Sequence, residues 1–370
     1  MKRLLIDINS IIPYYMNKHI TGLGRTTYEL VTALSQLEEL PFELILYSQN
    51  MKGISPKGDI PLKNFHVYLP NRTIFKKAVN GLRIKRIATH YDLFHVPHNT
   101  DLCENLKKTI FTIHDLIVYR YPEMWNVTED DKRYFRRVAK ESKAIITCSE
   151  SSRSDIIKFW KVQEEKVTAI PWGINRERFH PTADKTILKS LGIALPFFFC
   201  ASCNHPRKNT ALLLDAYRRY LKAGGTKLLV ILSPIGNELK ECEDLVENHQ
   251  VIITRNLSDT DLVSLYSHAH CTLMTSSYEG FGLPILESLA CGTQVLSANN
   301  SSLPEVGGKV VDYFEELTSQ CVCSHMLKVD GLEKHALLNP HRLHNHLDHY
   351  SWKNCAESYV SVYEKLLFHS

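Results

Sequence analysis

Two patterns of apolar residues alternate along the chain. Short, continuous apolar runs such as residues 3–8 and 144–147 predict buried strands, and between them lie stretches with apolar residues at helical spacing, such as residues 25–37. Continuous apolar strands separated by helices are typical of a parallel sheet that helices cover on both faces. The pattern therefore predicts an α/β fold of the doubly wound kind.

The alternation occurs in two series, and each series predicts one domain. In the first, strands are expected at 3–8, 42–47, 65–69, 93–96, 109–113 and 144–147, and helices at 25–37, 75–88, 130–140 and 151–159. In the second, strands are expected at 197–201, 227–232, 251–254, 271–275 and 294–297, and helices at 209–221, 238–247, 259–268 and 284–290. Proline and glycine punctuate residues 170–181, which favours a hinge there. We expect an N-terminal domain over 1–175, a C-terminal domain over 176–350, and a final helix within 351–370 that could pack on either domain, the N-terminal one included.

The composition is that of a globular protein, because 44% of the 370 residues are hydrophobic and 23% are charged. No apolar stretch approaches the ~20 residues of a membrane-spanning helix, and the first apolar run is too short for a signal peptide. Most of the ten cysteines lie in apolar runs, where packing is their ordinary role. We therefore expect a cytoplasmic protein.

Positive charge is concentrated in the first half of the chain. Residues 1–175 hold 26 lysines and arginines against 19 acids, a balance of +7, and the rest hold 18 against 21, a balance of −3, which together give the net charge of +4. Residues 71–90 carry six basic side chains and no acid, interleaved with apolar ones, and a second basic cluster lies within 132–140. Two interpretations stay open: peripheral binding to the anionic inner face of a membrane, or a solvated helix face. Nucleic-acid binding is disfavoured, because no recognition module accompanies the charge.

The most informative stretch carries two carboxylates eight positions apart, Glu279 and Glu287, with Gly280 and Gly282 between them. Pro284 then starts a predicted helix, at a position that helix geometry favours. Glycines ahead of a helix let backbone N–H groups approach a phosphate, and the helix N-terminus favours the phosphate charge. Glu287, expected in the first turn, could accept both hydroxyls of a ribose, and Glu279 could hold sugar hydroxyls. The alternative is a capped helix with an acidic first turn.

A basic pair, Arg207 and Lys208, follows the first predicted strand of the second series. The loops at the carboxyl ends of parallel strands are where such folds bind ligands. Arginine offers a fork of donors and lysine a point charge, so the pair could neutralise a diphosphate. Two exposed basic residues beside a turn are the alternative.

Two weaker signals lie in the first series. Gly22 and Gly24 form a glycine-rich turn between the first strand and the first long helix, although Thr27 stands where a dinucleotide fingerprint needs its third glycine. His114 ends a buried strand and precedes Asp115. A polar group at such a strand end suits a binding site. A satisfied core histidine is the alternative.

These segments, in this order, resemble family 4 of the retaining glycosyltransferases, whose GT-B fold has two Rossmann-like domains facing across a cleft. Glu279 to Glu287 is similar to the family's Glu-x7-Glu signature, and Arg207-Lys208-Asn209 to its Arg-Lys-Asn loop. Other similar segments are Gly22-Leu-Gly-Arg25, His114-Asp115, Cys148-Ser-Glu150, Pro171-Trp-Gly-Ile-Asn175 and Leu303-Pro-Glu-Val306. The similarity runs from the first strand to about residue 305. The sequence departs from the family pattern at Asn175, Gly308-Lys309 and Ala201-Ser202.

The resemblance implies a nucleotide-sugar donor bound mainly by the C-terminal domain and an acceptor bound by the N-terminal domain. It implies that Glu287 holds the ribose, that Arg207, Lys208 and backbone amides hold the diphosphate, and that Glu279 and His114 hold the donor sugar. The implied catalytic set is His114, Arg207, Lys208 and Glu279, and the implied donor-binding set is Gly22, Gly24, Arg25, Gly280, Phe281, Gly282, Leu283 and Glu287.

We expect a metal-independent reaction that retains the anomeric configuration. Negative charge grows on the departing phosphate, and Arg207, Lys208 and a helix N-terminus could stabilise it without a metal. The Asp-x-Asp at Asp259-Thr-Asp261 follows Ser258, and we expect it to cap a helix and not to bind a metal. No metal or other cofactor is predicted.

The expected function is transfer of a sugar to a glycan or a polyprenyl-diphosphate-linked acceptor in the synthesis of a cell-surface polysaccharide. This expectation follows from the similarity to bacterial polysaccharide and lipopolysaccharide glycosyltransferases. Two other functions stay open: a non-catalytic scaffold subunit that binds nucleotide sugars, and a UDP-sugar epimerase of the GT-B fold.

Overall fold

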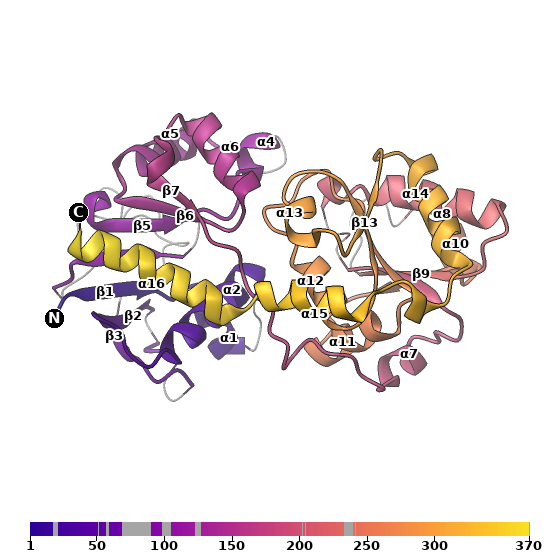
Figure 1. Ribbon diagram of the computed structural model, residues 1–370, viewed down its shortest axis with the longest axis horizontal. Coiled ribbons are helices and arrows are strands. Elements are labelled where there is room, and N and C mark those ends of the chain that lie inside the picture. The colour runs from indigo at the N-terminus through magenta and orange to yellow at the C-terminus, as the bar shows by residue number, and fades with distance from the viewer. Residues whose placement is uncertain are drawn as a thin grey trace. The chain divides into compact units, whose positions relative to one another are not determined.

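The computed structural model describes residues 1–17, 21–50, 52–56, 59–68, 90–97, 105–122, 127–201, 203, 205–232, 240 and 242–369. The chain divides into two compact units, which Figure 1 colours by position in the sequence. One unit is Met1–Gly173 together with Trp352–Ser370, and the other is Ile174–Ser351. Nearly all of the basic stretch at 71–90, with the helix expected at 75–88, lies outside the described residues, and the predictions about it stay predictions.

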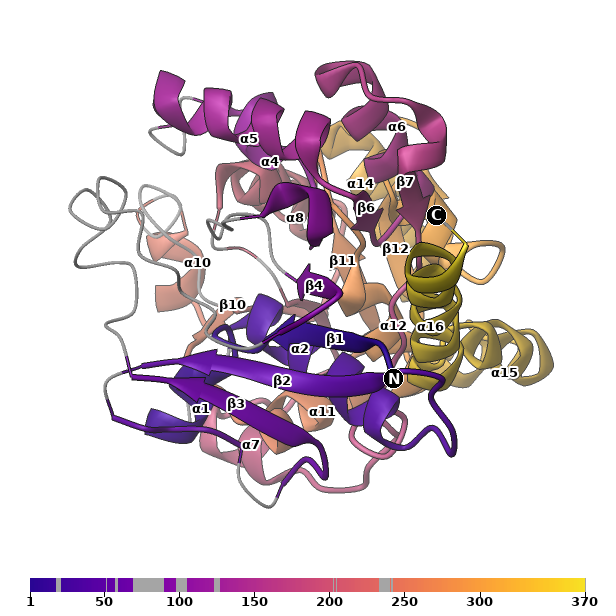
Figure 2. The same cartoon turned by 90° about the vertical axis from the view of Figure 1, so that its left-hand side faces the viewer.

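A parallel sheet forms the centre of the first unit. In the described part of this unit its seven strands have the order β3-β2-β1-β4-β5-β6-β7, and each neighbouring pair is parallel. The strands are β1 Arg3–Asp7, β2 Glu43–Gln49, β3 Lys63–Val67, β4 Leu93–Val96, β5 Thr109–Thr112, β6 Ala144–Thr147 and β7 Val167–Ala169. Figure 2 shows β3, β2, β1 and β4 side by side. The strand order reverses between β1 and β4, which is where doubly wound folds bind ligands.

Helices cover both faces of this sheet. Successive residues of a strand point to opposite faces, so Leu4 and Ile6 join one core and Leu5 joins the other. The helices α2 and α16 pack on the first core, and α5 and α6 pack on the second. The helices of this unit are α1 Ile12–Asn17, α2 Gly22–Ser35, α4 Ile117–Arg120, α5 Glu129–Glu141, α6 Glu150–Trp160 and α16 Trp352–Phe368, with short 3-10 turns at Leu106–Lys108 and Glu164–Lys166.

The last helix, α16, completes the core of the first unit although it follows the second unit in sequence (Figure 1). Tyr359 and Tyr363 are fully buried in this core. The hydroxyl of Tyr363 lies 2.7 Å from Nδ1 of His95, and Nε2 of His95 lies 2.8 Å from the hydroxyl of Thr112. That hydroxyl lies 3.3 Å from the hydroxyl of Tyr359. The network joins α16 to β4 and β5, so the helix is part of the first unit's core.

The second unit repeats the arrangement. In its described residues, six parallel strands have the order β10-β9-β8-β11-β12-β13, which reverses between β8 and β11. The strands are β8 Phe197–Cys200, β9 Leu228–Leu232, β10 Val251–Thr254, β11 Cys271–Met274, β12 Val295–Ala298 and β13 Asp312–Phe314. The helices are α7 Thr186–Ser190, α8 Thr210–Lys222, α10 Glu243–Glu247, α11 Asp259–His268, α12 Leu283–Ala290, α13 Leu303–Gly307, α14 Ser319–Asp330 and α15 Pro340–His349, with 3-10 turns at Pro206–Lys208 and Lys334–Ala336. These two doubly wound units confirm the predicted fold class.

The Asp-x-Asp segment caps a helix, as predicted. Ser258 is the N-cap of α11, and its hydroxyl accepts a hydrogen bond from the backbone N–H of Asp261 at 3.1 Å. The carboxylate of Asp261 accepts one from the backbone N–H of Ser258 at 3.0 Å, which closes the capping box.

Several predicted boundaries and elements differ from the structure. The helix expected at 238–247 is described only over Glu243–Glu247 as a helical span. The strands β7 and β13 were not predicted, because each has three residues and too few apolar positions to show a pattern. The helix α15 was not predicted either, because its only apolar side chains beyond its proline are two leucines among polar residues. No described helix combines the length and the apolar character that crossing a bilayer requires.

Replacing Tyr363 with phenylalanine should destabilise the first unit. The change removes a buried hydroxyl that partners His95, and losing one partner of a buried polar group costs about 1–3 kcal/mol. All four tryptophans lie within the first unit's sequence ranges, so urea unfolding followed by tryptophan fluorescence reports on this unit. Tyr68→Phe is the matched control, because Tyr68 is 67% exposed. Equal unfolding midpoints for both variants would contradict the role given to the network.

Candidate active site

The candidate site lies where the strand order of the second sheet reverses. The loop after β8 carries Arg207 and Lys208, and the loop after β11 carries Glu279. Because β8 and β11 are parallel neighbours, their carboxyl ends lie at the same edge of the sheet. The structure thus brings the adjacent Arg207 and Lys208 together with Glu279, which follows Lys208 by 71 positions in the sequence.

Backbone and side-chain hydrogen bonds fasten these two loops to each other. The hydroxyl of Thr275 donates to the carbonyl of Lys208 at 2.8 Å, and the amide nitrogen of Ser277 donates to the carbonyl of Arg207 at 2.8 Å. The side-chain amide of Asn209 donates to the carbonyl of Thr275 at 2.9 Å. Asn209 has a φ of +53°, a left-handed conformation that asparagine tolerates better than most residues. The 3-10 turn over Pro206–Lys208 is therefore held against the second loop.

A buried ion triad forms the centre of the site. One carboxylate oxygen of Glu279 lies 2.5 Å from Nζ of Lys208, and the other lies 2.6 Å from a terminal guanidinium nitrogen of Arg207. The same nitrogen of Arg207 donates to the carbonyl of Tyr278 at 2.7 Å. The side chains of Lys208 and Glu279 are 6% and 9% exposed, so water screens the triad little.

The two cations keep the carboxylate ionised. Burial alone raises the pKa of Glu279, but the charges of Lys208 and then Arg207 outweigh burial and lower that pKa to about 2. A carboxyl with a depressed pKa stabilises the fold above its unfolded pKa of about 4.3, and this stabilisation is lost only as the pH falls toward 2. At neutral pH, two positive charges face one negative charge, so the loops keep an excess positive charge that suits an anion.

The loop from Gly280 to Gly282 leads into the N-terminus of α12. Gly282 is the N-cap and has a φ of +112°, and a Cβ there would approach a methyl carbon of Leu303 to 2.9 Å. Both the backbone conformation and the close approach therefore require glycine. The hydroxyl of Ser302 donates to the carbonyls of Glu279 and Phe281, at 3.0 and 2.7 Å, and so holds the loop. The first amides of a helix have no partner within the helix, so this N-terminus can receive an anion.

The prediction that Glu287 lies in the first turn of the helix is wrong. The helix α12 begins at Leu283, so Glu287 is its fifth residue and lies in the second turn, and Pro284 is the second helical residue. The alternative of an acidic first turn that stabilises the helix dipole is excluded for the same reason. The carboxylate of Glu287 is 9% exposed and accepts a hydrogen bond of 2.9 Å from the hydroxyl of Tyr266. Tyr266 thus orients this carboxylate one helical turn beyond the loop.

Gly22, Gly24 and Arg25 belong to the first unit, and the prediction that the glycines form a turn is wrong. They lie in the first turn of α2, which begins at Gly22, and the short helix α1 precedes it. The hydroxyl of Thr21 caps α2 by accepting a hydrogen bond from the backbone N–H of Gly24 at 3.1 Å. The backbone N–H of Arg25 donates to the carbonyl of Thr21 at 2.8 Å, so the start of α2 already bonds the amides of Gly24 and Arg25.

His114 also lies in the first unit, directly after β5. Its ring is 5% exposed, its Nε2 donates to the carbonyl of Pro97 at 3.1 Å, and its centroid lies 5.1 Å from that of Trp172. With Thr26 and Thr27 of α2 it lines a narrow pocket in this unit. The predicted site residues thus form two groups. In the first unit, His114 lies in one pocket with residues of α2. In the second unit, Arg207, Lys208 and Glu279 form the ion triad beside the loop that leads into α12.

Three residues that fix the site were not predicted: Tyr266, Thr275 and Ser302. Tyr266 lies at an apolar position of α11, where its pattern is that of a core residue. Thr275 and Ser302 act through hydrogen bonds to backbone carbonyls. No sequence pattern marks such partners.

Comparisons with known proteins show which families and relatives the chain resembles. The family model "Glycosyltransferase Family 4" matches residues 20–178, and the model "Glycosyl transferases group 1" matches residues 191–312. The O-antigen chain mannosyltransferase B of Escherichia coli is 26% identical over 370 residues, which cover 94% of this chain and 97% of that protein.

Solved structures show the same fold. The sucrose-phosphate synthase of Thermosynechococcus elongatus superposes with a TM-score of 0.72 at 16% identity, and all of both chains is covered. The Anabaena protein HepE, in complex with UDP and glucose, superposes with a TM-score of 0.69 at 16% identity over 99% of this chain and 100% of that one. At such identities the likeness shows the fold alone. The two family models, one for each doubly wound unit, show a glycosyltransferase related to family 4, and the solved structures show that its fold is GT-B.

Proposed function

We propose that the protein transfers a sugar from a nucleotide-diphosphate sugar to a glycan or lipid-linked acceptor in the synthesis of a cell-surface polysaccharide. The transfer would retain the anomeric configuration and need no metal. The observation that carries the proposal is the buried triad of Arg207, Lys208 and Glu279 beside the N-terminus of α12.

The triad and the helix supply what the leaving group needs. As the glycosidic bond breaks, negative charge grows on the diphosphate, and preorganised cations and amides at that position lower the barrier. Arg207 and Lys208 are held in place by Glu279 and by the loop hydrogen bonds, so they need not reorganise. In this proposal Glu287, oriented by Tyr266, accepts the ribose hydroxyls.

Two features support metal independence. The Asp-x-Asp segment of the chain is engaged in capping α11, where Asp261 bonds to Ser258. The positive charge that a divalent ion would bring to the diphosphate is available from Arg207 and Lys208.

The proposal for the acceptor is supported by the E. coli relative and by the basic character of the first unit's sequence. The E. coli relative is named for O-antigen chain synthesis, and it matches this protein over nearly the whole of both chains. In the proposal His114 contacts the donor sugar, and the first turn of α2, with Gly22, Gly24 and Arg25, lies against the donor phosphates. The first unit would bind the acceptor, and its basic segments, including residues 71–90, would bind the anionic inner face of a membrane.

Glu287→Gln should weaken nucleotide binding. A ribose hydroxyl bonded to a carboxylate contributes about 1.5–3 kcal/mol, so the dissociation constant of the preferred nucleoside diphosphate should rise roughly ten- to hundredfold. Calorimetric titration with UDP, GDP and ADP in EDTA measures this and also identifies the base. Glu247→Gln is the control, because Glu247 is exposed on α10. An unchanged dissociation constant in Glu287→Gln would contradict the proposal that Glu287 binds the ribose.

Lys208→Gln and Glu279→Gln should affect binding and turnover differently. Lys208→Gln removes a phosphate partner, so both nucleotide affinity and kcat should fall, with kcat falling about 10²–10³-fold. Glu279→Gln releases both cations from their internal carboxylate, so affinity for the free nucleoside diphosphate should stay equal or rise while kcat falls. Binding titrations and steady-state rates, with exposed Lys222→Gln as the control, measure both. Parallel losses of nucleotide affinity in the two variants would contradict a sugar-binding role for Glu279.

Donor turnover should persist in EDTA, and the first product should keep the donor's anomeric configuration. The measurement is a time-resolved proton NMR assay of transfer or donor hydrolysis. Activity that requires added Mg²⁺ or Mn²⁺ would refute metal independence, and an inverted first anomer would refute retention. Absence of any turnover, with nucleotide binding intact, would instead favour the scaffold function.

A further inference from the structure

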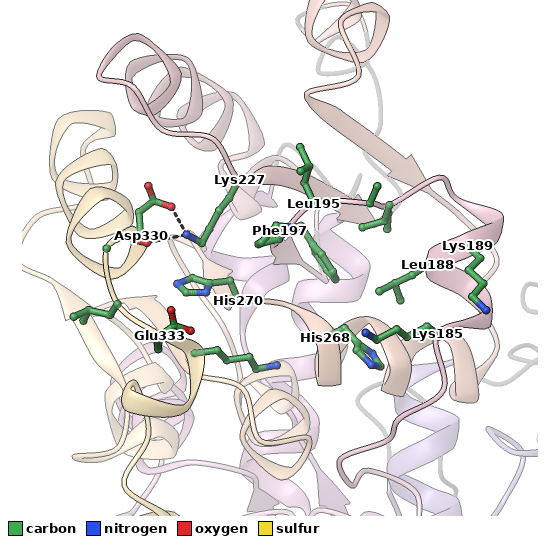
Figure 3. A pocket seen from close by; sticks show the side chains of 16 residues that line it. Lys185, Leu188, Lys189, Leu195, Phe197, Lys227, His268, His270, Asp330 and Glu333 are labelled. Atoms are coloured by element: carbon green, nitrogen blue, oxygen red, sulfur yellow. Dashed lines mark hydrogen bonds and ion pairs between the residues drawn. The ribbon is translucent and has the colours of Figure 1, made fainter.

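A pocket of about 550 Å³ opens in the second unit at the amino-terminal edge of its sheet (Figure 3). Phe197 begins β8, Lys227 directly precedes β9 and His270 directly precedes β11, and all three residues line the pocket. The loops that hold Arg207, Lys208 and Glu279 follow the opposite ends of β8 and β11. This pocket is therefore separate from the candidate active site, and its volume is in the usual range of about 300–1,000 Å³ for small-molecule sites.

Basic side chains outnumber acidic ones around the pocket. It is lined by four lysines, two histidines and two carboxylates: Lys185, Lys189, Lys227, Lys334, His268, His270, Asp330 and Glu333. One of the carboxylates is already engaged, since Lys227 bonds to an oxygen of Asp330 (Figure 3). The hydroxyl of Tyr220 bonds to the same oxygen. The pocket therefore keeps an excess of positive charge.

Lys334 is a desolvated cation without an ion pair among the described residues. Its ammonium group donates to the backbone carbonyl of Ser267 in the last turn of α11, and no carboxylate of the described residues lies within ion-pair distance of it. Burial lowers the pKa of Lys334 to about 8, although the nearby thiols of Cys291 and Cys271 act to raise it. A lysine that only capped an exposed helix end would not be desolvated in this way. One carbonyl also leaves two of its three N–H donors for another acceptor.

The two histidines belong to the segment 267–270, which also carries the Ser267 carbonyl that Lys334 binds. Nδ1 of His268 donates to the carbonyl of Ser264 at 2.9 Å, and Nε2 of His270 donates to the carbonyl of Val329 at 2.8 Å. Burial, then the charges of Lys227 and Lys334, lower the pKa of His270, although Asp330 acts to raise it. An anion in the pocket would favour the protonated ring of His270, which would then offer a second N–H donor.

Apolar side chains form another part of the pocket wall. Figure 3 shows Leu195 and Phe197 between the side that carries Lys227 and His270 and the side that carries Lys185 and His268. Leu195 is 54% exposed, so it offers apolar surface to a ligand. The combination suits a molecule with a compact anionic group and an uncharged body.

We propose that this pocket binds a small soluble phosphate ester, with the phosphate held by Lys334 and His270 and the body of the molecule lying against Leu195. A phosphate offers several strong acceptor oxygens and up to two negative charges. These match the unfilled donors and the excess charge of the pocket. The proposal does not depend on the function proposed for the other edge of the sheet.

The test is calorimetric titration of the full-length protein with inorganic phosphate and with glucose 6-phosphate. In Lys334→Gln the dissociation constant should rise roughly ten- to hundredfold, as expected for a lost charge-assisted hydrogen bond. Lys309→Gln removes an exposed lysine of the same unit and should bind like the unchanged protein. Thermal unfolding without ligand shows whether each variant is folded.

A second variant separates the two edges of the sheet. Arg207→Gln should leave binding of the two phosphate probes at this pocket intact. Loss of binding in Arg207→Gln with retention in Lys334→Gln would place the phosphate at the active-site loops and overturn the proposal. Binding only to vesicles of phosphatidylglycerol, and to neither soluble probe, would also overturn it, because the phosphate would then come from a lipid.

The pH dependence of phosphate affinity distinguishes a lysine that binds the phosphate from a lysine that only supports the fold. The charged and titratable groups around Lys334 are Lys185, Lys189, Lys227, His268, His270, Cys271, Cys291, Asp330 and Glu333. Between about pH 8 and 9.5 phosphate stays dianionic while the free protein's Lys334 loses its proton, so affinity should fall over this range. In Lys334→Gln the fall should be absent. A fall of equal size in both proteins would assign the titration to another group and contradict the proposed role of Lys334.

Discussion

The buried carboxylate of Glu279 is the constraint on which the candidate active site depends. Arg207 and Lys208 lie in a loop that has to be packed against a neighbouring loop, and a buried cation without a counter-charge would cost several kcal/mol. Glu279 supplies that charge from the loop after β11, so the electrostatic pairing and the docking of the two loops are the same event. The hydrogen bonds from Thr275 and Ser277 then fix the backbone that carries the cations. The result is a pair of positive groups that is rigid before any ligand arrives.

A site built in this way has an internal competitor for its own ligand. In the proposed function, a diphosphate would share Arg207 and Lys208 with Glu279, and the excess of one positive charge would make sharing possible without ejecting the carboxylate. The same arrangement would give Glu279 two roles that do not conflict. It holds the two cations in place, and in the proposed function its ionised oxygens would accept sugar hydroxyls while phosphate oxygens take over part of the cations' hydrogen bonding. The N-terminus of α12 adds amides on the far side of the same loop, and Gly282 is the residue that allows this approach.

Much of this arrangement could be predicted from the sequence, and the exceptions have physical reasons. The strands were predictable because parallel strands buried on both faces are continuous apolar runs, and so were the carboxyl-end loops that carry Lys208 and Glu279. The ion pair between these two residues was not predicted, because it depends on the pairing of β8 with β11, which are not consecutive strands. The position of Glu287 within α12 was predicted wrongly, because the helix starts at Leu283, one residue before Pro284. That start depends on the left-handed conformation of Gly282. Tyr266 and Lys334 were missed because their roles come from partners 21 and 67 positions away, which no local pattern reveals.

Two lysines at opposite edges of one sheet illustrate how burial can be used in different ways. Lys208 is neutralised by a carboxylate of its own protein, and the pKa of that carboxylate, about 2, lies far below neutrality, so the charges of the active-site loops do not change over the physiological range. Lys334 has only a carbonyl, and its pKa of about 8 lies close to that range. In the two proposals, an anion at Lys208 would share a cation that Glu279 already neutralises, whereas an anion at Lys334 would supply a counter-charge that no carboxylate of the described residues provides. The first kind of site selects its ligand by geometry at constant charge, and the second couples ligand binding to the uptake of a proton.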